Sequence, residues 1–417
     1  MIRTVFMALT GWLMACFPAF SQVTLTECRE KAKANYPLVR QYGLLDLSER
    51  YDLENVVKGN LPQVVLSGKA SYQSSVTTLP VSLPGVSFKG LPKDQYNVVA
   101  EVRQNLWDGG QMRAHREQVK ASTEEGRRLM DVNLYQLNEQ VDQLYFSILL
   151  QDEQLKENIL LQDELERNHR QITSYIRNGI ANEADLDAVK TELLSARQQR
   201  IGIEAGRKAY MKMLALLTGM PLSESTVLEK PAVPNEAAGI NRPELKWYEA
   251  QLNSLAVREN ALKTRYKPNF SLFAQGGVGN PGLNMLKNGW EPYYVIGARV
   301  TWNFSSLYTL KNDRRLLEVQ RHTIEDNRAA FLLNTNIRLA EQDEAANALE
   351  AQMKEDEEII RLRTNVRKSA EAKVGGGTLS VTEMLRELTN ESMARQNKAT
   401  HEIQLLMRLY RKQYLAN

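Results

Sequence analysis

The residue types that most often carry out chemistry are sparse and scattered in this sequence. Its four histidines lie far apart on segments with helical periodicity and lack the short spacing of metal ligands: His115, His169, His322 and His401. A nucleophile-elbow pattern, Gly-x-Ser-x-Gly, does not occur. We therefore expect no catalysis, no bound metal and no other cofactor.

Two glycine-rich stretches could suggest nucleotide binding: one formally matches the dinucleotide fingerprint, and the other could suggest a phosphate-binding loop. In GVGNPG, residues 277–282, Pro281 and the turn-rich residues beyond it predict a hairpin loop, whereas a dinucleotide site needs a helix to start there. The run Gly375–Gly377 follows no predicted strand, and Lys-Ser/Thr does not come after it. We expect neither stretch to bind a nucleotide.

Two glycine turns are more informative, because each is followed six residues later by an acid and then by a leucine. Glycine tolerates a positive φ, so each is predicted to end one helix and turn the chain into the next. The residues are Gly179, Asp185 and Leu186 in the first turn, and Gly377, Glu383 and Leu385 in the second.

The charged residues beside these turns have ordinary structural roles open to them. Glu383 and Arg386 are three residues apart on one predicted helix face and could form a solvated ion pair. Asp185 and Asp187 could cap a helix or lie on its exposed face.

Long helical patterns flank both turns. Residues 111–177 contain no proline, and their apolar residues follow the alternating three-and-four spacing of a coiled-coil seam: Leu134, Leu137, Val141, Leu144 and Ile148. Further long helices are predicted at 183–218, 311–372 and 381–415. Helices several times longer than the usual length of about 11–12 residues need neighbours along their whole length, so we expect two antiparallel helical hairpins.

Four segments with alternating polarity predict strands: 62–73, 96–103, 268–278 and 293–302. Each has one apolar face, and their lengths are close to the length of about 9–11 residues that a transmembrane β-strand needs. A soluble hairpin packed on helices would alternate in the same way, so both interpretations stay open. Four strands cannot close a membrane barrel, and open edges do not persist in lipid. If these strands span a membrane, several chains must share one barrel.

These elements occur twice, which indicates an assembly made by duplication and not an enzyme built around one cleft. Pro62 and Pro268 begin corresponding strands, and Gly179 and Gly377 lie in corresponding turns. The predicted division is a first repeat at 22–220 (β-hairpin 62–105, helical hairpin 111–218), a Pro- and Ala-rich linker at 221–243, and a second repeat at 244–417 (β-hairpin 268–304, helical hairpin 311–415).

The composition of the chain and its first residues limit the classes of protein to which it can belong. The chain has 417 residues, with 53 Lys and Arg against 50 Asp and Glu, so no strong field for nucleic acid is implied. Residues 1–21 combine Arg3, an apolar run and a small-x-small site ending at Ser21, which predicts a secretory signal peptide. A lipoprotein-type site at Cys16 is the alternative. Only Cys28 would remain after cleavage at Ser21, so no intramolecular disulfide could form.

Over the whole mature chain, this arrangement resembles the TolC-type outer-membrane efflux proteins. The opening TLTECREKAKANYPLVRQYGL, residues 24–44, is similar to the family's start, with Tyr36 inserted before the expected proline. NLWDGGQ, residues 105–111, resembles the family's turn from barrel strand into long helix, with Asp108, Gly109 and Gly110 in the turn. The second copy, WNFSSL at 302–307, lacks these glycines. The two glycine turns are the most specific match.

The resemblance implies a fold that is mainly α with membrane β. Four strands per chain would contribute to a trimeric 12-stranded outer-membrane β-barrel, continued by a periplasmic α-barrel of coiled-coil helices. It implies the exit duct of a tripartite efflux or secretion system, a passive conduit for small molecules or proteins. The implied partners are a homotrimer, outer-membrane lipid, a periplasmic adaptor and an inner-membrane pump of RND, ABC or related type. Nucleic acid is not among them. The alternative function is a periplasmic coiled-coil adaptor or scaffold without a barrel.

The resemblance also implies roles for the turn residues. The helical tips would dock the adaptor through Gly179, Gly377, Leu186 and Leu385. Residues just after the second tip narrow the periplasmic aperture in this family. Glu383 and Arg386 occupy the matching positions, where a trimer would repeat each charge around one axis. Asp185 and Asp187 are the corresponding gate candidates of the first half.

Overall fold

The structure is a computed structural model that describes residues 22–77, 91–235, 239–285 and 287–417. The predicted signal peptide 1–21, the alternative site at Cys16 and the middle of the loop between the first two strands lie outside the described residues. Its contacts divide the chain into two compact units. The helical unit contains the described residues up to Tyr36, Gln136–Gly239 and Arg338–Ala416; the sheet unit contains Pro37–Tyr135 and Ile240–Ile337. Each unit therefore takes segments from both repeats.

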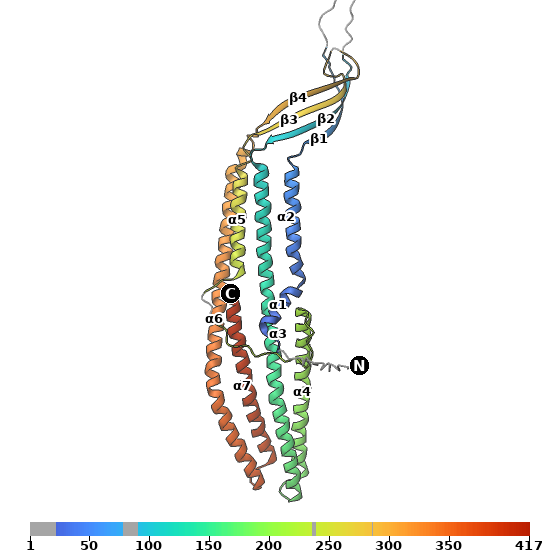
Figure 1. The fold of residues 1–417 in the computed structure, drawn as a ribbon. Coiled ribbons are helices and arrows are strands. Elements are labelled where there is room, and N and C mark those ends of the chain that lie inside the picture. The colour runs from blue at the N-terminus through green and yellow to red at the C-terminus, as the bar shows by residue number, and fades with distance from the viewer. Residues whose placement is uncertain (1–21, 78–90, 236–238, 286) are drawn as a thin grey trace, which may run out of the picture. The chain divides into compact units, whose positions relative to one another are not determined.

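The sheet unit holds four antiparallel strands in the order β1-β2-β3-β4 (Figure 1). They are β1 (Gln63–Tyr72), β2 (Asp94–Trp107), β3 (Asn269–Asn280) and β4 (Glu291–Thr301). A 3₁₀ turn η1 (Pro37–Val39) and helix α2 (Arg40–Lys58) precede the first hairpin, and α5 (Pro243–Leu262) precedes the second. Pairing of β2 with β3 joins the two hairpins into one sheet, with Glu101 opposite Gln275.

The helical unit consists of two long antiparallel hairpins and a short first helix. Its elements are α1 (Leu25–Asn35), α4 (Glu183–Thr218), α7 (Val381–Ala416) and the later parts of α3 (Gln111–Arg177) and α6 (Ser306–Gly375). The bounds of α3 and α4 are those predicted from the sequence. Helix α6 starts five residues earlier and ends three residues later than predicted. The earlier parts of α3 and α6 belong to the sheet unit.

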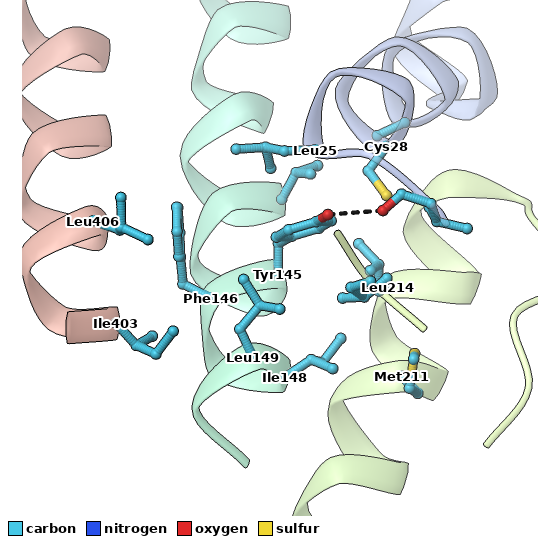
Figure 2. Packing of buried hydrophobic residues seen from close by; sticks show 14 of the residues in the cluster. Leu25, Cys28, Tyr145, Phe146, Ile148, Leu149, Met211, Leu214, Ile403 and Leu406 are labelled. Atoms are coloured by element: carbon cyan, nitrogen blue, oxygen red, sulfur yellow. Dashed lines mark hydrogen bonds between the residues drawn. The ribbon is translucent and has the colours of Figure 1, made fainter. Parts of the chain in front are cut away.

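One core of the helical unit lies where α1 meets α3, α4 and α7 (Figure 2). The predicted seam residues Leu137, Val141 and Ile148 are buried there. The hydroxyl oxygen of Tyr145 lies 2.8 Å from the backbone carbonyl of Val23 and 2.7 Å from that of Glu229, and its single proton is donated to this pair of acceptors. Each large apolar side chain buried here contributes about 1.5–3 kcal/mol.

Cys28 belongs to the same core. Burial, with a smaller effect of Glu27, raises the pKa of its thiol to about 12. A thiol that stays protonated at neutral pH is a poor nucleophile, so Cys28 serves as a small core side chain.

The described part of the predicted linker packs against the helical unit. Leu228 is buried and forms an isolated parallel bridge with Val23. Arg207 on α4 donates to the backbone carbonyls of Glu224 (2.5 Å) and Thr226 (3.0 Å). Composition indicated a connector here but could not show this attachment, which depends on residues distant in sequence.

A second core joins the two hairpins near their tips. It combines α3 and α4 residues with α6 and α7 residues: Leu165, Ile172, Val189, Leu193, Ala196, Ala370, Val374, Val381, Met384, Leu385 and Leu388. The tips are therefore held by apolar packing from both repeats.

Candidate functional site

The sheet has its apolar face exposed. Even-numbered positions of the strands carry the apolar residues, and their side chains are largely accessible: Leu66 is 74% exposed, Tyr294 78% and Ile296 74%. Odd-numbered positions, which carry most polar residues, are mostly half-buried in β2, β3 and β4. A sheet packed on helices in water would show the opposite arrangement. Of the two interpretations that alternation left open, this exposure favours strands that span a membrane.

Polar side chains interact across the odd-numbered face. The Gln275 amide donates to the carboxylate of Glu101 at 2.5 Å, and the Arg299 guanidinium donates to it at 3.3 Å. Asn97 and the Tyr293 hydroxyl are hydrogen bonded at 2.8 Å. These contacts tie three strands together through the polar face, whereas the side chains of the apolar face are largely exposed.

The strand-to-helix turn after β2 is built from the three predicted residues. The Asp108 carboxylate accepts hydrogen bonds from the backbone N–H groups of Gly110 (2.8 Å) and Met112 (2.7 Å), and so caps the start of α3. Gly109 and Gly110 have φ of 70° and 88°. A Cβ on Gly109 would lie 2.7 Å from the Cβ of Lys267, so a larger residue does not fit.

Both helical tips end their first helix with the same backbone motif. Gly179 donates to the carbonyl of Ile176 while Ile180 donates to that of Tyr175, the paired bonds of a Schellman motif. The second tip repeats this, with Gly377 bonded to Val374 and Thr378 bonded to Lys373. Both glycines have positive φ, 73° and 70°. A helix N-cap follows three residues after each glycine, at Asn182 and at Ser380.

This geometry explains the acid six residues after each glycine, because that position is the third residue of the returning helix. At the first tip the Asn182 side chain accepts from the Asp185 N–H (3.1 Å), and the Asp185 carboxylate accepts from the Asn182 N–H (3.0 Å). This is a complete capping box. At the second tip Ser380 accepts from the Glu383 N–H at 3.2 Å, but the reciprocal bond is not formed among the described residues.

Apart from Asp185, which is half-buried, the gate candidates are exposed. Glu383, Arg386 and Asp187 all lie on the surface of their helices. Arg386 approaches Glu387 at 3.6 Å, and the ion pair between Glu383 and Arg386 that the sequence allowed is not formed in the described chain. Asp185 is occupied by capping, whereas the Glu383 carboxylate remains free of that role.

The docking candidates fall into two groups. Gly179 and Gly377 are exposed at the tips, and Leu186 is half-buried. Leu385 is only 4% exposed and lies inside the tip core, so its side chain supports the tip from within. The sequence reasoning overlooked Ile180, which is 43% exposed directly after the turn glycine. The sequence did contain a signal for Ile180, since an apolar residue directly follows the glycine that ends the helix.

A charged network joins α6 to α7 inside the helical unit. The Glu391 carboxylate, 2% exposed, accepts hydrogen bonds from Thr364 (2.7 Å), Arg395 (2.6 Å) and Arg367. Burial acts to raise the pKa of Glu391, but these three donors outweigh it and hold the pKa below its ordinary value. The sequence reasoning missed this network. The available signal was that Glu391 occupies the position of Leu193 when the two repeats are aligned, but the alignment does not identify the partners of Glu391.

Two negative findings concern the described residues alone. No described helix is both long and apolar enough to cross a membrane. The described histidines, cysteine and acids form no cluster that could hold a metal ion.

Comparisons with known proteins give one family match and several structural matches. Residues 30–220 match the model of the family described as outer membrane efflux protein. The structure of VceC, an outer membrane protein of Vibrio cholerae, is 12% identical with a TM-score of 0.66, and the match covers 94% of this chain and 96% of that one. The CmeC outer membrane channel of Campylobacter jejuni is 14% identical with a TM-score of 0.65, covering 95% and 86%. No curated protein sequence matches this chain.

A third solved structure, the open state of the MtrE outer membrane channel of Neisseria gonorrhoeae, is 17% identical with a TM-score of 0.60, covering 94% of this chain and 88% of that one. At such identities the likeness establishes the fold. The expected fold class, mainly helical with four strands per chain, is confirmed.

Proposed function

We propose that this chain, whose residues 30–220 match the model of the outer membrane efflux protein family, is a member of that family and that three copies form the outer-membrane exit duct of a tripartite efflux or secretion system. The four strands of each copy would supply a third of a shared barrel. The helices would extend into the periplasm, where the tips at Gly179 and Gly377 dock a periplasmic adaptor. An inner-membrane pump of RND, ABC or related type would drive transport, and the duct itself would be passive.

The observation that carries this proposal is the exposed apolar face of the sheet. Val64, Leu66 and Ile296 are 70%, 74% and 74% exposed. Exposing such a face to water would be costly, because each large apolar side chain gains about 1.5–3 kcal/mol on leaving water. In a membrane the same face contacts lipid, and the polar face lines an aqueous interior.

The open sheet edges support assembly from several copies. Strands β1 and β4 lie at the two ends of the sheet, and each has only one strand neighbour among the described residues. Unpaired backbone groups cannot face lipid, so a membrane sheet of this kind must close through other chains. Pairing β4 of one copy with β1 of the next would remove all the edges.

The test is fractionation of the full-length chain followed by sizing. We expect the protein to sediment with outer membranes, to require detergent for extraction and to run as a trimer. The alternative, a periplasmic adaptor or scaffold, predicts recovery in the soluble periplasmic fraction without detergent. A soluble periplasmic monomer would contradict the proposed function.

A further inference from the structure

The charged residues of the described strands gather on the polar face of the sheet. Successive residues of a strand point to opposite faces, and the strand register aligns odd-numbered positions of all four strands on one face. Asp94, at a strand end, is the one described charge on the opposite face. The charged residues on the polar face are Lys69, Glu101, Arg103, Glu291 and Arg299.

Both acids on this face are already engaged by cations or amides. Glu101 accepts from Gln275 and Arg299, and its side chain is 21% exposed. The carboxylate of Glu291 lies 3.5 Å from the ammonium group of Lys287, which is four residues earlier in the chain. Arg299 is also held over the Phe273 ring, 4.7 Å from its centroid. The negative charge of this face is therefore largely compensated by nearby cations, Arg299 in the sheet and Lys287 in the loop before β4.

Two cations on the same face are left accessible. The Arg103 side chain is 44% exposed and reaches Glu101 only at 3.9 Å, the outer limit of an ion pair. Lys69 on β1 is exposed, and the residue opposite it on β2 is the uncharged Asn97. No acid of the described chain lies within ion-pair distance of Lys69.

We propose that Arg103 and Lys69 make the interior of the shared barrel prefer anions, so that anionic solutes pass it more readily than cations. This inference rests on the proposed trimer, in which each cation recurs three times around the axis. Rings of arginine and lysine favour anions in water-filled pores, because their field raises the local anion concentration. The solutes selected would carry carboxylate, phosphate or similar groups.

The test is ion selectivity of the full-length protein in planar lipid bilayers. A gradient between about 0.1 M and about 0.01 M KCl keeps screening lengths near about 10 Å and about 30 Å, so fixed charges on the wall act across the pore. We expect Arg103→Gln and Lys69→Gln each to lower the chloride-to-potassium permeability ratio by about twofold. Arg103→Lys, the matched control, should keep the wild-type ratio, and Glu101→Gln should raise it.

The outcomes separate this inference from the proposed function. An unchanged permeability ratio in both glutamine variants, at wild-type conductance and trimer content, would overturn the role of these cations. A ratio lowered equally by Arg103→Lys and Arg103→Gln would also overturn it, because charge would not be the cause. A wild-type chain that forms neither trimers nor conducting pores would overturn the proposed function itself.

Discussion

The two helical hairpins share their tips but not their interiors. Gly179 and Gly377 lie 198 residues apart, as do the N-caps Asn182 and Ser380, and both tips close with the same Schellman bonds. The same spacing pairs Leu193 with Glu391. Leu193 on α4 packs in the apolar core that joins the two hairpins near their tips, whereas Glu391 on α7 holds a buried charged network between α6 and α7.

A second pair of equivalent positions shows the same difference. Asn158 of the first hairpin donates to the backbone carbonyl of Ala196 at 3.2 Å, a neutral contact. Its counterpart in the second hairpin is Asp356, which lies 2.8 Å from the Nδ1 atom of His401. The two copies therefore share the backbone geometry of their tips, and at these two equivalent positions only the second hairpin has an ionisable group. Around these positions, the stability of the second hairpin should therefore depend on the ionisation of Glu391, whereas the first hairpin has the uncharged Leu193 and Asn158 there.

The largest expected effect comes from removing the buried acid. Glu391→Ala removes the shared partner of Arg367 and Arg395 and leaves Arg367 paired with Glu371, and breaking a buried ion pair from one side costs up to about 3–5 kcal/mol. Leu193→Ala, the matched change in the first hairpin, removes only apolar contact and should cost about 2–4 kcal/mol. Hydrogen exchange of α4 and α7 measures the two losses separately. Equal protection of α7 in wild type and Glu391→Ala would contradict the role of the network.

The next effect is a loss of stability in acid confined to the second hairpin. The pKa of Glu391 is lowered in the fold, so its stabilisation is complete above the unfolded value of about 4.5 and is lost as pH falls through the lower folded value. Exchange protection of α7 should fall in this range, while protection around Leu193 on α4 is retained. Glu391→Gln should abolish the difference between the hairpins. An equal loss of exchange protection in both hairpins of the wild type would contradict the proposed difference between them.

Much of the fold follows from local sequence signals. The start and end of α3 and α4 were predictable because Asp108, Gly179 and Asn182 are capping residues whose side chains or backbone freedom act within a few positions. The strands were predictable for a similar reason, because the alternation of polar and apolar residues lies within each strand. The exposure of the apolar face and the burial of Glu391 were not predictable from periodicity, because both depend on which surfaces meet in three dimensions.

A smaller effect distinguishes the caps of the two tips. Asn182→Ala removes the side chain of a complete capping box and should cost about 1 kcal/mol of local stability. Asp185→Asn should weaken the same box, whereas Glu383→Gln should leave the second tip unchanged, because the Glu383 carboxylate makes no reciprocal bond. Exchange at the first turns of α4 and α7 reports these losses. A stability loss in Glu383→Gln equal to that in Asp185→Asn would show that the tips are capped alike.

The same residues separate capping from gating. If Glu383 contributes to a gate, Glu383→Ala should alter single-channel conductance or its block by divalent cations with little change in stability. Asp185→Asn is the control, and it should change stability more than conductance. Conductance and divalent block identical to wild type in Glu383→Ala would leave Glu383 as a surface charge only.

The central claim, that the apolar face of the sheet meets lipid and the polar face meets water, can be measured directly. Single cysteines at neighbouring β1 positions, Leu66→Cys and Ser67→Cys, would carry a fluorescent label in proteoliposomes; Cys28 is buried and serves as the unlabelled background. The account predicts quenching of the label at 66 by a lipid-bound quencher, and at 67 by a water-soluble one. Water-soluble quenching at both positions would contradict it.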